Sequence, residues 1–187
     1  MGNSIPSARN ITSLLVHPAC CWTDCLRNPS RKCIQTFALN PLTVSASPNS
    51  PGVAFADFFY PRLDPPLYSR CDEIRLSKDS TSIVPQRRGV LKMDGSFQTD
   101  CNSGTVVFQY RILLNNQILR LTDSAQFFWP AFVTGYRNVI PLSLALNVKA
   151  GDKVQIQFEA SLIEGAETDG SVTVGGINSF LVLELLQ

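Results

Sequence analysis

Histidine is almost absent from this chain of 187 residues, which contains one, His17, directly before Pro18. Histidine is the side chain that most often transfers protons in catalysis, so a single one away from any nucleophile turn leaves few routes to such chemistry. The sequence also has no G-x-S-x-G turn, no P-loop and no H-E-x-x-H helix. We therefore expect no catalytic residues, no cofactor and no enzymatic activity.

Carboxylates do gather in one short stretch: Glu159, Glu164, Glu167 and Asp169. Two carboxylates must face each other across a cleft before they can share acid–base work. These four lie on a solvent-facing strand or in the Gly-rich loop that follows it, and this loop leads into another strand rather than into a helix that binds phosphate. We interpret them as solvated groups.

Charge is scarce, at 17% of residues, and nearly balanced, with 16 Lys and Arg against 15 Asp and Glu. Proteins that bind phosphate backbones need a concentrated basic surface. The first 35 residues contain few basic side chains: Arg9, Arg27, Arg31 and Lys32. We expect no direct contact with nucleic acid, and we interpret Arg27, Arg31, Lys32 and the pair Arg87-Arg88 as surface or inter-subunit salt-bridge donors.

Long hydrophobic runs are missing too. No stretch approaches the ~20 apolar residues that a membrane-spanning helix requires. The patch ITSLLV near the start is shorter than a signal-peptide core and follows no basic region. We expect a chain without a membrane span that is made in the cytosol.

Cysteine, by contrast, is plentiful: Cys20, Cys21, Cys25, Cys33, Cys71 and Cys101. The first four and His17 have the spacing H-x2-CC-x3-C-x7-C, which offers soft ligands for zinc but matches no familiar zinc module. We favour structural cysteines, as disulfides or buried thiols, and no metal site. Six cysteines allow 15 pairings, and the sequence leaves the choice open.

Proline punctuates the first part of the chain, from Met1 to Pro51, and prevents long regular elements there. Short strands at IQTFAL or LTVSA are compatible with the pattern. We assign residues 1–51 to an irregular N-terminal arm, rich in Cys and Pro, that packs on something else. Residues 52–187 form the folded domain.

Alternation of apolar and polar residues marks this domain as a β-sheet protein. Residues 140–148 and 154–160 alternate on either side of the turn KAGDK, and one face of the second run is Lys, Gln and Glu. A face that meets water indicates an antiparallel sheet. A further alternating run at 105–112 is followed by an Asn115-Asn116 hairpin turn, and the aromatic stretch at 126–132 is interpreted as a core strand.

The last strand, NSFLVLELLQ, is apolar on both faces apart from Glu184. An antiparallel strand in a monomer needs one apolar face, so the second indicates cover by the other sheet's edge or by another subunit, and we favour the subunit. The residues that we expect at an oligomer interface are Phe180, Leu181, Val182, Leu183 and Leu185.

The carboxyl half resembles the tumour-necrosis-factor-like jelly roll, especially the globular head of the complement first component. The matching residues are Leu144 and Leu146, Ala150-Gly151-Asp152, Val154 and Ile156, and Asn178-Ser179-Phe180. The likeness covers about Thr105 to Gln187 and implies a single antiparallel jelly-roll β-sandwich. The sequence has no collagen-like stalk, and the calcium ligands of that family cannot be placed residue by residue on it. Viral capsid jelly rolls explain the same residues.

From these features we predict a non-enzymatic structural protein, a self-assembling single jelly-roll capsid component at a vertex or in a minor position. Its partners are further copies of itself, as a pentamer or trimer, and neighbouring capsid proteins. It would be located in the virion. The alternative is a trimeric binding module or spike head that recognises a receptor or glycan outside the cell.

Overall fold

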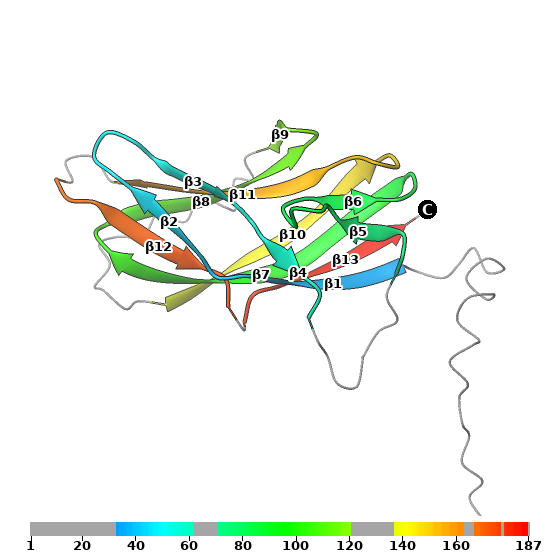
Figure 1. Ribbon diagram of the computed structural model, residues 1–187, viewed down its shortest axis with the longest axis horizontal. Helices are drawn as coiled ribbons and strands as arrows, with labels where there is room; N and C mark the ends of the chain where they lie inside the picture. Colours follow the sequence, from blue (N-terminus) through cyan, green and yellow to red (C-terminus); the bar gives the residue numbers. More distant parts are fainter. Residues whose placement is uncertain (1–32, 62–70, 121–136, 163–166, 177, 187) are drawn as a thin grey trace, which may run out of the picture. The chain divides into compact units, whose positions relative to one another are not determined.

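The computed structural model describes residues 33–61, 71–120, 137–162, 167–176 and 178–186, all within one compact unit that runs from Lys32 to Gln187. Every regular element among them is a β-strand, and the strands form two antiparallel sheets packed face to face (Figure 1). No helix in this part of the chain is long and apolar enough to cross a membrane. The predicted all-β sandwich is confirmed.

The larger sheet has seven strands and is built around β7 (Gly89–Ser103). One edge of β7 pairs with β10 (Arg137–Val148), and the other pairs with β13 (Phe180–Leu186) and then with β12 (Gly170–Val174). The remaining strands lie beyond these two: β1 (Cys33–Leu39) pairs with β13, β2 (Leu42–Ala46) with β12, and β4 (Phe58–Phe59) with β1.

The smaller sheet has six strands around β11 (Val154–Leu162). One edge of β11 pairs with β8 (Val106–Leu114), which in turn pairs with β9 (Gln117–Arg120). The other edge of β11 pairs with β3 (Gly52–Phe55) and with β6 (Ile83–Pro85), whose hairpin partner is β5 (Ile74–Leu76).

The connections between the sheets give the jelly-roll topology. Most consecutive strands lie in different sheets, so the chain crosses repeatedly; the consecutive pairs that share a sheet are β1 and β2, β5 and β6, β8 and β9, and β12 and β13. The first strand, β1, and the last, β13, lie side by side in the larger sheet (Figure 1). Such crossing connections around a closed pair of sheets define the double-sheet jelly roll.

The core lies between the sheets and has an aromatic centre. Phe97 on β7 meets Phe158 on β11 edge to face, with ring centroids 5.4 Å apart, and Phe108 on β8 stacks on Phe158 at 5.7 Å. All three side chains are almost completely buried. Such pairs add about 0.5–1.5 kcal/mol beyond the burial of their area, so they hold the two sheets together.

The two turns predicted from the sequence are confirmed. β10 ends at Val148 and β11 begins at Val154, and Gly151 between them has a φ of 84°. Asn115 and Asn116, between β8 and β9, have φ values of 52° and 67°, the left-handed conformation that tight hairpin turns need. The aromatic stretch at 126–132 lies outside the described residues.

The sandwich begins earlier than the predicted boundary between residues 51 and 52. Residues 33–39 and 42–46 form β1 and β2, which belong to the larger sheet rather than to an arm. The physical reason is a period of two: Phe37 and Leu39 are buried in the core, and Pro41 falls between the two strands, where its missing N–H breaks no ladder. Residues 1–32 lie outside the described part of the chain.

This boundary is testable by truncation. Removing residues 1–31 should leave a cooperatively folded domain, because the compact unit begins at Lys32. Removing residues 1–40 also deletes β1 and should unfold the domain, because burying Phe37 and Leu39 alone contributes about 3–6 kcal/mol. Thermal unfolding followed by circular dichroism distinguishes the two; similar melting temperatures would show that β1 is dispensable.

Candidate functional site

The last strand, β13, presents two different faces. Leu181, Leu183 and Leu185 are at most 1% exposed and belong to the core that lies between the two sheets. The prediction that these three lie at an oligomer interface is therefore wrong, because the chain's own second sheet already covers them. Phe180, at 46% exposure, and the half-buried Val182 lie on the outer face.

The outer face of the larger sheet carries an exposed apolar row. The strand register places Phe59, Ala38, Phe180, Ser96 and Pro141 side by side across β4, β1, β13, β7 and β10. Phe59 is 42% exposed, which is close to the exposure of Phe180. The two aromatic rings flank the small side chain of Ala38, so they stand on one surface without a bulky side chain between them. We call these five residues the outer row.

Polar groups border the outer row on the side of Asp94. The Asp94 carboxylate accepts a hydrogen bond from Ser143 Oγ at 2.6 Å and lies 3.3 Å from Lys92 Nζ. The hydrogen bond from Ser143, and to a lesser degree Lys92, hold the pKa of Asp94 below its usual value. An apolar centre with a charged and hydrogen-bonded border is the composition of protein–protein interfaces.

The strand at the end of the outer row, β10, has an open edge. Among the described strands β10 pairs with β7 alone, so the backbone groups along its second edge have no strand partner there. Residues 138–148 carry no charged side chain, and Val139 is 50% exposed. Exposed edges usually carry charges that prevent pairing with other chains; here Pro141 is the main obstacle.

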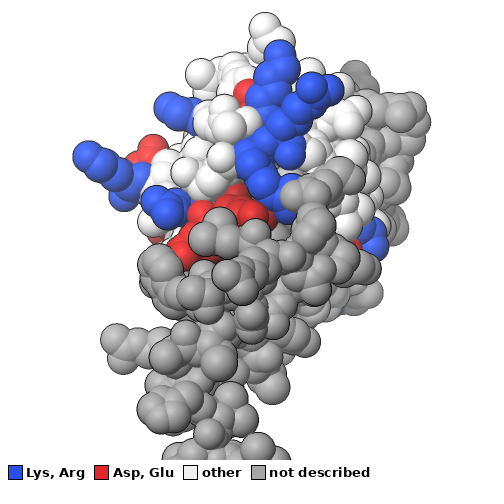
Figure 2. Space-filling view, turned by 90° about the vertical axis from the view of Figure 1, so that its right-hand side faces the viewer, with Lys and Arg blue, Asp and Glu red and all other residues white. Residues whose placement is uncertain are grey.

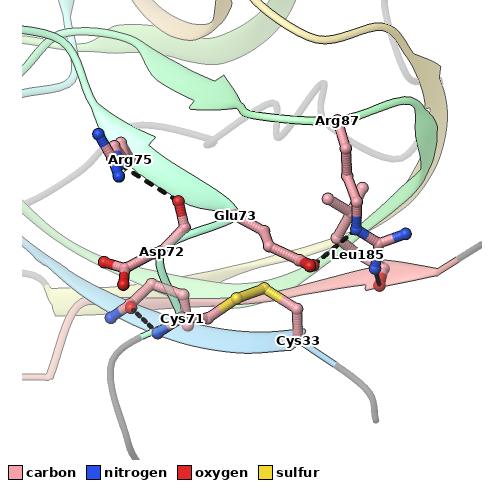
Figure 3. The surroundings of a disulfide bond; sticks show 8 residues. Cys33, Cys71, Asp72, Glu73, Arg75, Arg87 and Leu185 are labelled. Carbon is pink, nitrogen blue, oxygen red and sulfur yellow. Dashed lines mark hydrogen bonds and ion pairs between the residues drawn. A yellow bond between two sulfur atoms is a disulfide. The ribbon is translucent and has the colours of Figure 1, made fainter. Parts of the chain in front are cut away.

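A disulfide closes one end of the sandwich. Cys33 on β1 and Cys71 just before β5 are bonded, with their Cα atoms 5.6 Å apart, so the bond links the larger sheet to the smaller one (Figure 3). The backbone N–H of Cys71 also donates to Gln35 Oε1 at 3.2 Å. The sequence had left this pairing open, because the two cysteines meet only through the fold.

Arg87 reinforces the same end. Its Nε donates to Glu73 Oε2 at 2.6 Å, and its Nη2 donates to the backbone oxygen of Leu185 at 3.3 Å (Figure 3). Arg87 therefore joins the segment before β5 to β13, next to the disulfide, and is a salt-bridge donor as predicted. We call Cys33, Cys71, Glu73, Arg87 and Leu185 the end staple.

The other cysteines contribute no second bond in the described residues. Cys101 is a buried free thiol, and burial raises its pKa, which keeps it protonated and inert. Cys20, Cys21, Cys25 and His17 lie outside the described part of the chain. Cys33 is disulfide-bonded to Cys71, so it cannot serve as a zinc ligand together with those residues. Cys33, Cys71 and Glu73 have the spacing of metal ligands, but the two sulfurs are bonded to each other.

The interpretation of the four acidic residues as solvated groups is wrong for Glu159, whose side chain is 13% exposed and ion-paired. Glu159 is held by Arg111 Nη2 at 2.6 Å and by Gln109 Nε2 at 2.9 Å. Glu167 and Asp169 are exposed, and Glu164 lies outside the described residues.

The sequence analysis did not identify Phe59 and Val139 as residues of the outer face. The alternation of inward and outward residues along a strand could have found them, but the run of aromatic residues around Phe59 hides that alternation.

Comparisons by sequence find no match, either to a family model or to a curated protein. Solved structures are similar in fold. The structure of infectious bursal disease virus, Gt strain, matches with a TM-score of 0.55 and 11% identity over 84% of this chain and 34% of that chain. The VP2 subviral particle of the same virus matches with a TM-score of 0.55 and 12% identity over 84% of this chain and 33% of that chain.

A second kind of structure matches as well. Eiger TNF from S. frugiperda has a TM-score of 0.52 and 17% identity over 83% of this chain and 93% of that chain. This chain thus spans about a third of the viral proteins and nearly all of the TNF protein. The fold of the chain is the jelly roll that viral capsid and TNF-like proteins share, as the resemblance of the carboxyl half implied.

The end staple predicts a large loss of stability when the disulfide is removed. The bond closes a chain segment with a sequence separation of 38, for which loop-closure entropy gives roughly 4 kcal/mol. Cys71→Ser should lower the free energy of unfolding by about that amount in urea titrations, and reductant should lower wild type to the level of the variant. Cys101→Ala serves as the thiol control; equal stability of wild type with and without reductant would contradict the staple.

The two faces of β13 predict different consequences of truncating their side chains. Leu183→Ala should cost about 2–5 kcal/mol of unfolding free energy at any protein concentration, because it opens a cavity in the core. Phe180→Ala should leave unfolding of the single chain within about 1 kcal/mol, because its ring is half exposed. Urea titrations at low protein concentration measure both, and equal losses would contradict the assigned faces.

Proposed function

We propose that the chain is a non-enzymatic structural subunit that associates with further copies of itself through the outer row of the larger sheet. The observation that carries this proposal is the exposure of Phe59 and Phe180, at 42% and 46%, on a sheet face of regular strands. Aromatic side chains anchor interfaces because they bury a large area at a small cost in conformational entropy.

Energetics favour covering this surface. Soluble monomers rarely expose contiguous apolar patches beyond a few hundred Å², and complete burial of one Phe contributes about 1.5–3 kcal/mol. The outer row brings two Phe rings together with Ala38 and Pro141, and Val139 lies on the same face of β10. Another copy that covers the row would also bring hydrogen-bonding groups to the open edge of β10.

The assembly that we favour is a single jelly-roll capsid component, as a pentamer or larger closed particle within a virion beside neighbouring capsid proteins. Support comes from the fold likeness to virus structures, one of which is a subviral particle, and from a separate border of polar groups around an apolar centre. Because this chain spans about a third of those proteins, a role in a whole particle is part of the proposal.

The alternative is a trimeric binding module outside the cell. One support is the TNF structure, of which 93% is covered by the match to this chain. The other is the disulfide, a bond that persists in oxidising compartments and on virion surfaces. A measured mass distinguishes the two: a trimer favours the binding module, and a pentamer or larger closed particle favours the shell.

Substitution in the outer row tests the proposal directly. Phe59→Asp combined with Phe180→Asp should dissociate the assembly to monomers, because two carboxylates would have to be buried at the contact without partners. Both positions are half exposed, so the single chain should still fold. Light scattering coupled to gel filtration measures the mass, and circular dichroism checks the fold.

The matched control is Ile118→Asp on β9 of the smaller sheet. Ile118 is 53% exposed, as accessible as the two Phe residues, and it lies on the other sheet. It should leave the mass unchanged. A wild-type monomer, or an unchanged mass of the double variant, would overturn the proposed assembly surface.

A further inference from the structure

Basic side chains gather at the end of the sandwich that carries the turn between β10 and β11. Figure 2 looks at this end of the molecule and shows Lys and Arg side chains in a group beside a smaller acidic area. Two turns meet here, because the N–H of Gly151 donates to the backbone oxygen of Pro85 at 2.8 Å. Residues 86–88 of one turn therefore lie beside residues 149–153 of the other.

Two cations lie where these turns begin. Val148 pairs with Gly89 as the last step of the ladder between β10 and β7, so the next residues, Lys149 and Arg88, extend from opposite sides of the same position. Both are exposed, and neither has a salt bridge among the described residues.

The third cation, Lys153, is fixed by the neighbouring hairpin turn. Its backbone N–H donates to Asn115 Oδ1 at 2.9 Å, and its backbone oxygen accepts from the N–H of Asn115 at 2.9 Å. Asp152, the acidic residue of this turn, is already occupied: it accepts from Asn115 Nδ2 at 3.0 Å and from the N–H of Lys149 at 2.7 Å. The hydrogen bond from Asn115, and to a lesser degree attraction to Lys149, lower the pKa of Asp152, so this carboxylate offsets part of the charge, and the three cations outnumber it.

We propose that Arg88, Lys149 and Lys153 form a binding site for a sulfated polysaccharide. An array of exposed cations recognises repeated sulfate groups, and the adjacent exposed amides of Gln86, Asn115 and Asn116 supply hydrogen bonds for sugar hydroxyls. Arg87 is not part of the site, because Glu73 and Leu185 hold it in the end staple.

Two features favour a polysaccharide over a nucleic acid. Residues 86–88, 115–116 and 149–153 include no aromatic side chain on which bases would stack. The disulfide between Cys33 and Cys71 fits a protein exposed to an oxidising environment, which is where sulfated polysaccharides occur. The site is separate from the outer row, since Gly89 and Ser96 lie roughly 20–25 Å apart along β7. It does not depend on the proposed assembly.

Binding of the full chain to immobilised heparin tests the site. Arg88→Gln with Lys149→Gln should weaken binding at least 10-fold and lower the salt concentration needed for elution. The control pair, Lys78→Gln with Arg137→Gln, removes the same charge from exposed positions, and Arg137 lies at the far end of β10. It should change binding less than 2-fold. Equal weakening by both pairs would show that net charge alone acts and would overturn the site.

A second measurement needs no variant. Acetylation of lysines in wild type, with and without heparin, should show protection of Lys149 and Lys153 but not of Lys78 or Lys92. Reaction of all four at unchanged rates would overturn the proposal. So would tighter binding of single-stranded RNA than of heparin at equal ionic strength, since this outcome would indicate a nucleic-acid site.

Discussion

The pairing of the first strand with the last holds this fold together. β1 and β13 align from Cys33 opposite Leu185 to Ala38 opposite Phe180, and this ladder places β13 between β1 and β7 in the larger sheet. The buried leucines of β13 then complete the core from one side. The end staple acts at the same place, because Cys33 is bonded to Cys71 and Arg87 reaches the backbone of Leu185. Core, ladder and crosslink thus support one another.

The same strand joins the inside of the domain to its outer surface. Because successive side chains point to opposite faces, a strand that fills the core at Leu181 and Leu183 presents Phe180 and Val182 outward. The outward residues meet Ala38 and Phe59 on one side and Ser96 on the other. A surface of this kind is as rigid as the core behind it, which favours a contact of fixed geometry.

The sequence predicted a strand and its buried face where polar residues alternate with apolar ones. Apolar residues alternate with Pro, Ser, Ala and Asn in 140–148 and with Lys, Gln and Glu in 153–160, so the strands, the turn and the inward face followed directly. β13 has a single such marker, Glu184, so the sequence showed two largely apolar faces but not which one the chain itself covers. The disulfide and the exposure of Phe59 depend on which strands become neighbours, and no local pattern encodes that. Pro41 made the sequence around β1 and β2 look irregular, although this proline lies between the two strands and interrupts neither.

The order of synthesis gives the neighbourhood of β1 and β13 a further consequence. As the ribosome extends the chain, β1 emerges well before β13, so the larger sheet stays incomplete until β13 has been made. Until then the inward face of β1 has no leucine partners and is open to unintended contacts. Cys33 and Cys71 both precede β13 by a long stretch of chain, so in an oxidising compartment their bond can form before β13 is made and keep β1 close to where its partner will arrive.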